Sequence, residues 1–183
     1  MKATDVLKHE HKLVLAVLGA AEKDAERMRE TGKVDADRIR QYLEFFRVFV
    51  DQCHHAKEEH RLFPWLEDRG FPGEGGPIAV MLAEHDEGRG YVEAIESELR
   101  GVEEDKPEAV AALADALTSY ADLLRAHIAK ENNVLFPMAD ARLSDQDQED
   151  LITEFNVIEA EEVGVGVHER CHRLAEGLLQ KGE

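Results

Sequence analysis

Cysteine and long apolar runs are both scarce in this sequence of 183 residues. Its two cysteines, Cys53 and Cys171, cannot build a disulfide framework, which suits a reducing compartment, so we expect a cytoplasmic protein. No apolar stretch approaches the ~20 residues that a membrane-spanning helix needs. The apolar run 13–21 resembles the core of a signal peptide, but acidic Asp5 and Glu10 stand where such a leader is basic. We therefore assign the run to the folded domain.

Positive charge is also in short supply. Lysine and arginine total 22 against 40 aspartates and glutamates, which gives a formal net charge of −18. Nucleic acids and anionic lipid surfaces are bound by clustered cations, so we expect neither as a partner. An acidic surface typical of soluble proteins accounts for the excess. The length fits one domain, 1–183, that buries a substantial core, and the oligomeric state stays open.

A duplicated motif organises the first 140 residues. The stretch His54–Pro64 recurs 73 residues later as His127–Pro137, and both copies read His-x-x-Lys-Glu-x-x-x-Leu-Phe-Pro. A Glu-His pair precedes each copy, as Glu10-His11 and as Glu84-His85. Self-similarity at a fixed spacing indicates repeated structural units. Here the repeated residues are types that bind metal ions.

Apolar residues recur at alternating spacings of three and four, which predicts helices. The predicted ranges are about 4–30, with Thr4 as N-cap, 35–68, 77–100, 107–140 and 144–181, the last opened by a capping box at Ser144. We expect Pro64 and Pro137 to kink their helices and to free the carbonyl four residues back. Gly164 and Gly166 are expected to bend or break the last helix. No strand pattern appears. The fold class predicted is all-α: an up-down-up-down four-helix bundle over about 4–140 with an additional C-terminal helix.

In such a bundle the duplicated residues meet at one level. Two histidines come early in their helices, and the His-x-x-x-Glu pairs come late in theirs, so antiparallel packing brings all six together in the interior. A lone histidine on an apolar stripe is usually an ordinary core residue. Two buried carboxylates without counter-charge, however, cost several kcal/mol each, so this core implies cations. The six candidate ligands are His11, His54, Glu58, His85, His127 and Glu131.

Six ligands exceed the four of a closed zinc site. They suit two metal ions about 3.5–4 Å apart, each with two histidines and both bridged by Glu58 and Glu131. With an oxo or hydroxo bridge, open positions remain, which favours non-haem iron, with zinc or manganese as alternatives. The Glu-x-x-His spacing of ferritin-like bundles is absent from the four helices.

The doubled motif resembles the hemerythrin-like (HHE cation-binding) domain family over about residues 5–140. The resemblance implies a four-helix bundle with a non-haem di-iron centre held by the same six residues. Oxygen-carrying members have a further histidine one turn after the ligand of the third helix, where this chain has Arg89. The pattern is therefore similar to relatives that sense or process iron, nitric oxide or peroxide.

Three functions remain open from the sequence. The first is a redox, sensing or detoxification protein that binds or processes dioxygen, nitric oxide or peroxide at a di-iron site. The second is a module that stores or delivers iron without turnover. The third is a bundle that metal only stabilises. An open coordination position separates the third from the others, and turnover of peroxide separates the first from the second.

His168 and His172 match the His-Glu-x-x-His pattern of zinc proteases. Only eleven residues follow, too few for the usual third ligand. If the last helix runs back along the fourth, His168 lies about 20 Å from the metal level. We therefore expect both histidines to pack with Val165, Ala175 and Leu179 instead.

Two other side chains invite a role at the metal centre. His55 and Glu59 repeat the His-x-x-x-Glu spacing, but their counterparts Ile128 and Asn132 cannot bind metal in that way. We expect His55 to lie between helices or beside a ligand without coordinating. Tyr120 stands two turns before a ligand position, where it can donate to a bound molecule, although a core role is favoured.

Overall fold

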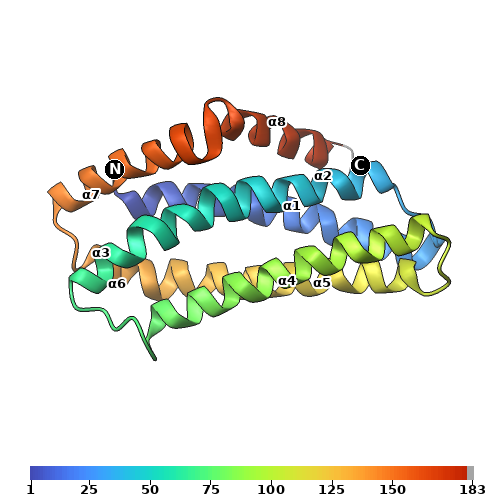
Figure 1. Ribbon diagram of the computed structural model, residues 1–183, viewed down its shortest axis with the longest axis horizontal. Helices are drawn as coiled ribbons and strands as arrows, with labels where there is room; N and C mark the ends of the chain where they lie inside the picture. The colour runs from blue at the N-terminus through green and yellow to red at the C-terminus, as the bar shows by residue number, and fades with distance from the viewer. Residues whose placement is uncertain (181–183) are drawn as a thin grey trace.

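Four long helical segments, each antiparallel to the next along the chain, form a bundle in the computed structural model, which describes residues 1–180 (Figure 1). The first is α1 (Ala3–Thr31) and the third is α4 (Pro77–Glu103). The second joins α2 (Ala36–Phe45), the π-helical η1 (Phe46–His55) and η2 (Glu58–Leu62), and α3 (Phe63–Asp68). The fourth joins α5 (Ala109–Lys130), the π-helical η3 (Glu131–Leu135) and α6 (Phe136–Asp140). No strand occurs in this part of the chain, so the all-α prediction is confirmed.

Two apolar clusters fill the bundle, one on each side of a polar level. The larger holds the buried residues of α1 from Val14 onward, those of α5 up to Ile128, and the phenylalanines of η1. The smaller holds Leu7 and the Leu-Phe pairs that precede the two motif prolines. The predicted stripes therefore pack as core, and burial of their apolar area is the main stabilising term. Within residues 1–180, no helix is both long and apolar enough to cross a bilayer.

A π-helical turn precedes each proline of the duplicated motif. The residue before the proline donates its N–H to a carbonyl five positions back, namely Phe63 to Glu58 and Phe136 to Glu131. These wider turns accommodate the rings, which lack a backbone N–H and crowd the preceding turn. The carbonyl of His60, predicted to be freed by Pro64, accepts a hydrogen bond from Arg61 Nη1 at 2.9 Å.

The start of α1 differs from the prediction. Lys2 is the N-cap residue, and Thr4 lies inside the first turn. The Thr4 hydroxyl donates to Asp140 Oδ1 at 2.7 Å, so it links α1 to the end of α6 instead of capping its own helix. The predicted end is confirmed: Gly32 has a φ of 67°, a left-handed conformation that suits glycine after a helix.

A fifth helical segment packs along α1 and α2 (Figure 1). It consists of α7 (Asp145–Val157), the π-helical η4 (Ile158–Gly164) and α8 (Val167–Gln180). The capping box at Ser144 is confirmed, since its hydroxyl accepts from Asp147 N at 3.2 Å. The predicted break at Gly164 and Gly166 is confirmed: η4 ends at Gly164, α8 begins at Val167, and the two glycines have φ of 109° and 79°. Residue 181 of the predicted range lies outside the described residues.

Candidate metal centre

The polar level of the bundle is made by six buried side chains from all four segments. Each occupies a position on an apolar stripe, as His11 does between Leu7 and Val14 on α1. None is more than 2% exposed. They are the four histidines and two glutamates expected from the duplicated motif: His11, His54, Glu58, His85, His127 and Glu131.

The first two histidines face each other between α1 and η1. Their Nε2 atoms lie 3.0 Å apart. His11 Nε2 is 3.1 Å from Glu131 Oε2, and His54 Nε2 is 3.7 Å from Glu58 Oε1. Two imidazole nitrogens and one oxygen from each carboxylate therefore surround one point, as the ligands of a metal ion do.

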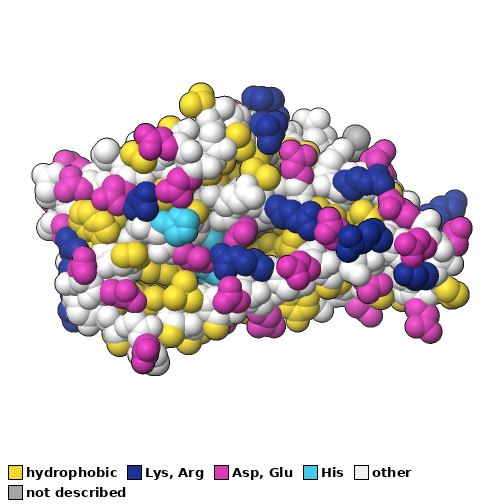
Figure 2. Space-filling model, in the orientation of Figure 1, with side chains coloured by type: hydrophobic (Ala, Val, Ile, Leu, Met, Phe, Trp, Pro, Cys, Tyr) yellow, Lys and Arg dark blue, Asp and Glu magenta, His cyan; other side chains and the backbone are white. Residues whose placement is uncertain are grey.

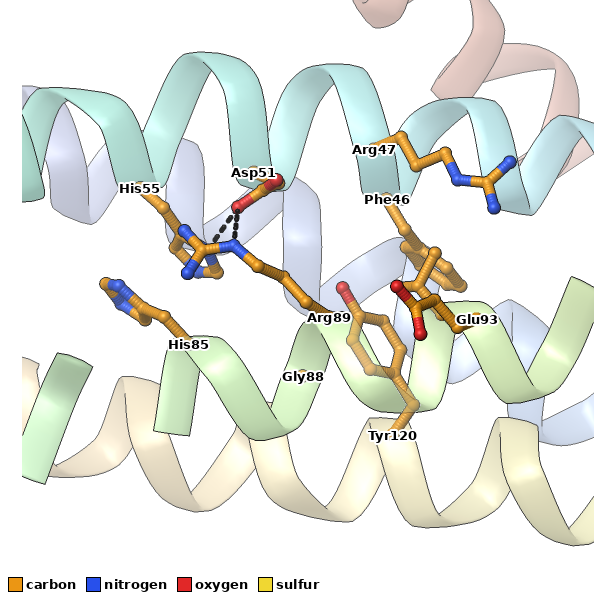
Figure 3. Close-up of a pocket in the computed structure, with 10 residues that line it drawn as sticks. Phe46, Arg47, Asp51, His55, His85, Gly88, Arg89, Glu93 and Tyr120 are labelled. Carbon is orange, nitrogen blue, oxygen red and sulfur yellow. Dashed lines mark hydrogen bonds and ion pairs between the residues drawn. The ribbon is translucent and has the colours of Figure 1, made fainter. Parts of the chain in front are cut away.

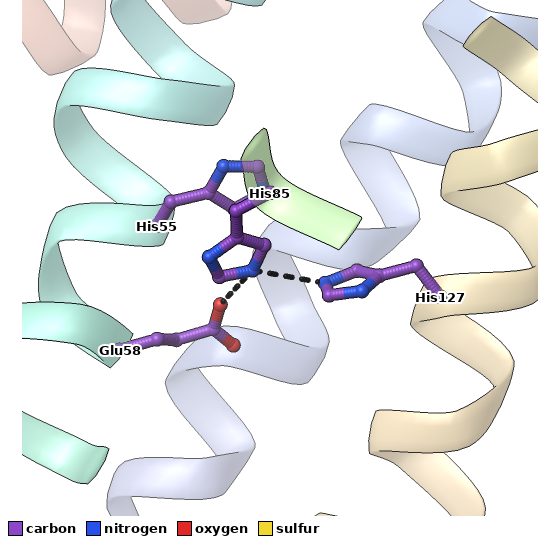
Figure 4. Close-up of side chains that lie close together, drawn as sticks. All are labelled: His55, Glu58, His85 and His127. Atoms are coloured by element: carbon purple, nitrogen blue, oxygen red, sulfur yellow. Dashed lines mark hydrogen bonds and ion pairs between the residues drawn. The ribbon is translucent and has the colours of Figure 1, made fainter. Parts of the chain in front are cut away.

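The other two histidines repeat this arrangement between α4 and α5 (Figure 4). The Nε2 atoms of His85 and His127 lie 3.1 Å apart. His85 Nε2 is 3.4 Å from Glu58 Oε2, and His127 Nε2 is 3.3 Å from Glu131 Oε1. Each glutamate thus presents one oxygen to each histidine pair. This is the geometry of two carboxylates that bridge two neighbouring ions.

The two glutamates test whether the site fits metal. Both are fully buried, and none of their four carboxylate oxygens makes a hydrogen bond. A buried polar group without a partner costs on the order of 1–3 kcal/mol, and more when charged. Burial and the neighbouring Glu131 hold the pKa of Glu58 well above its usual range. Positive ions between the carboxylates satisfy the oxygens and remove the repulsion, so the donor set fits metal.

The Nδ1 atom of each of the four histidines also makes a hydrogen bond, which directs Nε2 toward the centre. His54 Nδ1 donates to Glu10 Oε2 at 2.7 Å, and His127 Nδ1 donates to Glu84 Oε2 at 2.9 Å. A carboxylate on the outer nitrogen fixes the tautomer and orients the ring for a metal. The glutamate of each Glu-His pair therefore has a function that sequence reasoning missed, although the repeat held the signal.

The remaining two histidines have partners that differ between the halves. His85 Nδ1 donates to Glu59 Oε1 at 2.7 Å, and His11 Nδ1 donates to Asn132 Oδ1 at 2.9 Å. The pKa of Glu59 falls to about 2, because its bonds with His85 and Arg89 outweigh the effect of burial. An anionic partner makes an imidazole more basic than a neutral amide does, so the His85 side differs electronically from the His11 side.

The lysines of the duplicated motif hold the two orienting glutamates. Lys57 is fully buried and bonds to Glu10 and, at 2.5 Å, to Glu159 Oε1 of η4. Lys130 bonds to Glu84, but its side chain is 42% exposed. The lysine in each copy of the motif therefore neutralises the carboxylate, Glu10 or Glu84, that orients a histidine.

Replacing these two lysines is expected to have unequal effects. Lys57→Ala leaves Glu10 buried without its cation and is expected to lower the free energy of unfolding by about 3–5 kcal/mol. Lys130→Ala removes a partly solvated ion pair and is expected to cost about 1 kcal/mol or less. Urea denaturation of both variants at equal metal content measures the difference. Equal losses would contradict the role of burial.

The C-terminal histidines lie elsewhere than expected. His168 Nε2 is 3.7 Å from Glu10 Oε1, so the predicted distance of about 20 Å from the metal level is wrong. The reason is that the fifth segment packs on α1 and α2. The interruption between η4 and α8 also leaves His168 only 3.9 Å from Glu159 of η4, which itself bonds to Lys57. Both histidine rings pack on Phe49, whereas Val165 is exposed.

A second acidic cluster surrounds this histidine. Ligand atoms of Glu10, Cys53, Glu159 and His168 lie within 4.8 Å of one another. The amino group of Lys57 bonds to both carboxylates of the cluster and supplies the positive charge there. His168 Nε2 lies 3.7 Å from Glu10 Oε1 and 3.9 Å from Glu159 Oε1 and makes no hydrogen bond, and His172 is not part of the cluster, so nothing supports the zinc-protease interpretation.

Comparisons with known proteins agree with this geometry. A model of the Hemerythrin HHE cation binding domain matches residues 2–139. Similar curated proteins include the iron-sulfur cluster repair proteins YtfE of Salmonella typhimurium and of Escherichia coli O1:K1. Each is 39% identical over 89 residues, which are 47% of this chain and 40% of the relative, so less than half of either protein is matched. No solved structure matches the chain.

Proposed function

The chain belongs to the hemerythrin HHE cation-binding domain family, and from this premise we propose a non-haem di-iron protein that binds and processes dioxygen, nitric oxide or a peroxide. The proposed ligands are the six buried residues of the duplicated motif. His11 and His54 would hold one ion and His85 and His127 the other, and Glu58 and Glu131 would each offer one oxygen to both. A pair of such ions supplies or accepts electrons at one small ligand.

The observation that carries this proposal is the placement of the two carboxylates. Each directs one oxygen to each histidine pair, and no protein donor satisfies any of the four oxygens. A single ion needs only one half of this set. Two histidine nitrogens and two carboxylate oxygens per ion leave coordination positions for an exogenous ligand on iron, with manganese or zinc as the alternative metals.

The relatives indicate a physiological setting. The matched curated proteins are named for the repair of iron-sulfur clusters. We propose that this chain likewise acts in iron handling or in detoxification of the oxidants that damage such clusters. A cavity that reaches His85 favours ligand binding over a bundle that metal merely stabilises. Storage or delivery of iron without turnover is the second candidate, because it uses the same ligands.

Arg89 argues against oxygen carriage. Its guanidinium is paired with Asp51 Oδ1 at 2.8 Å, Glu59 Oε1 at 2.6 Å and Asp86 Oδ1 at 2.8 Å. The side chain is therefore committed to three carboxylates and leaves the second ion without the additional histidine that the carriers have at this position. We propose a protein that reacts with its ligand and does not release it unchanged.

Metal analysis and one optical spectrum test the proposal. Protein purified in air after expression in iron-rich medium is expected to contain about two iron ions per chain and to absorb in the near ultraviolet through ligand-to-iron transitions. Zinc gives no such absorption. One zinc ion per chain without iron, in a folded protein, would refute the di-iron proposal.

A further inference from the structure

A cavity of about 240 Å³ opens beside one of the two histidine pairs (Figure 3). It lies between η1, α4 and α5, and His55, His85, Gly88 and Tyr120 are among its lining residues. Neither His11 nor His54 lines it. The cavity therefore gives access to the His85 side of the centre, and the near-twofold symmetry of the ligands does not extend to it.

His55 presents unused hydrogen-bonding capacity to this cavity. The residue is only 4% exposed, and its Nδ1 has no hydrogen-bond partner. The nearest carboxylate oxygen, Asp51 Oδ1, is 3.6 Å away, beyond hydrogen-bonding distance, and already accepts from Arg89 Nε. Buried polar groups in folded proteins are nearly always paired, so an unpaired one that lines a cavity indicates a ligand.

The orientation of the ring separates this role from metal coordination. The His55 ring stacks on His85 with centroids 3.7 Å apart and an angle of 12° between the planes (Figure 4). A ligand nitrogen binds an ion in the plane of its own ring. Because the two rings are stacked and nearly parallel, their planes do not share a point within the site, so His55 and His85 would not both direct an in-plane nitrogen at one ion. One nitrogen of His55 still lies within 4.8 Å of the ligand atoms of Glu58, His85 and His127.

Tyr120 is a second free donor on the same cavity. Its hydroxyl makes no hydrogen bond with any residue in the described part of the chain, although the side chain is buried. In Figure 3 the hydroxyl points toward the Asp51–Arg89 pair. Two uncommitted donors at one cavity match a molecule that carries hydrogen-bond acceptors.

The other half of the bundle has no counterpart to His55. The repeat places Ile128 there, also buried, so an apolar side chain stands where the imidazole stands in the first half. A ligand at the His85–His127 side can therefore accept a hydrogen bond that one at the His11–His54 side cannot.

We propose that the exogenous ligand, a small oxygen- or nitrogen-containing molecule or anion with an acceptor atom, binds on the His85–His127 side and accepts a hydrogen bond from His55 Nδ1. Tyr120 contributes a second, weaker contact, and the cavity is the route of access. This inference rests on the proposed function. It adds which side is used and which residues position the ligand without binding the metal.

Azide binding to the oxidised, iron-loaded full-length protein tests the inference. Azide is a small anion with acceptor nitrogens, and its binding to iron is followed by a visible absorption band. His55→Ile, which copies the residue of the other repeat, is expected to keep both irons and to raise the dissociation constant of azide about tenfold or more. Tyr120→Phe is expected to raise it a few-fold, and His172→Ile, a histidine away from the cavity, is expected to leave it unchanged.

A second measurement and a second variant at position 55 separate loss of the hydrogen bond from a general disturbance of the site. The infrared stretching frequency of bound azide is expected to shift when His55 is replaced, because the hydrogen bond is lost. His55→Asn, whose amide can donate from nearly the same place as Nδ1, is expected to restore part of the affinity.

The outcomes are distinct. Unchanged affinity and frequency in an iron-replete, folded His55→Ile protein would overturn the proposal, and so would loss of iron, since His55 would then be a ligand. A wild-type protein without an iron pair removes the proposed function as well, and the metal analysis reveals this before azide is added.

Discussion

Removal of the metal is expected to lower the melting temperature of this protein by roughly 10 °C. Metal binds the folded state and not the unfolded one, and saturation at a thousand times the dissociation constant contributes about 4 kcal/mol. For a chain of this size, 1 kcal/mol corresponds to about 2–4 °C. The structural cause is the pair Glu58 and Glu131, whose buried oxygens have no other partners.

Thermal unfolding followed by circular dichroism, with and without a chelator, measures this effect. Restoring the metal to the chelated sample should restore the melting temperature, which controls for damage by the chelator. Identical curves for the two forms would place any bound metal outside the core.

The difference in stability between the metal-bound and the metal-free protein is expected to widen as the pH rises. Without metal, the pKa of Glu58 is raised by burial and by Glu131, so the folded state holds a proton that the unfolded state loses above about pH 4.3. That contribution to stability is complete below the unfolded pKa and disappears as the pH rises through the folded pKa. Metal binding instead requires the ionised carboxylates, so the stability of the metal-bound form increases as the pH rises.

Much of this centre could be predicted because the sequence is duplicated. Spacing alone places His54 and Glu58 on one face of a helix, and the second copy shows that the same face recurs on another. Apolar stripes that continue through the histidines predicted a buried site, and the structure brings the residues together. The resemblance to the family then pointed to the same positions.

The π turns could not be predicted. Proline in a helix predicts a kink. Whether the helix bends or widens by one turn depends on how the Leu-Phe pair before each proline packs into the smaller apolar cluster. The widened turn begins at Glu58 and Glu131 themselves, so it also sets the direction of the bridging carboxylates.

The path of the fifth segment was also beyond sequence reasoning. It has no second copy, and an amphipathic pattern gives the buried face of a helix without naming its partner. The prediction that it follows the fourth helix put His168 far from the centre, whereas it contacts Glu10. His55 was harder still, because its lack of a hydrogen-bond partner is a property of three dimensions only.

The number of ions lost is expected to depend on which ligand is removed. Glu58→Ala or Glu131→Ala takes one oxygen from each histidine pair at once, so both ions should be weakened and the iron content should fall toward zero. His11→Ala or His85→Ala removes a ligand from one pair only. Those variants should keep about one ion per chain, held by the intact pair and both carboxylates.

Iron per folded chain, measured after identical dialysis, distinguishes these cases, with His172→Ile as a control expected to keep about two. The two glutamate variants should behave alike, because each carboxylate serves both positions. If instead each glutamate variant kept one ion, as each histidine variant should, the carboxylates would be terminal ligands and the bridging geometry would be wrong. The stoichiometry therefore tests the bridge separately from the presence of metal, since either result requires that metal is bound.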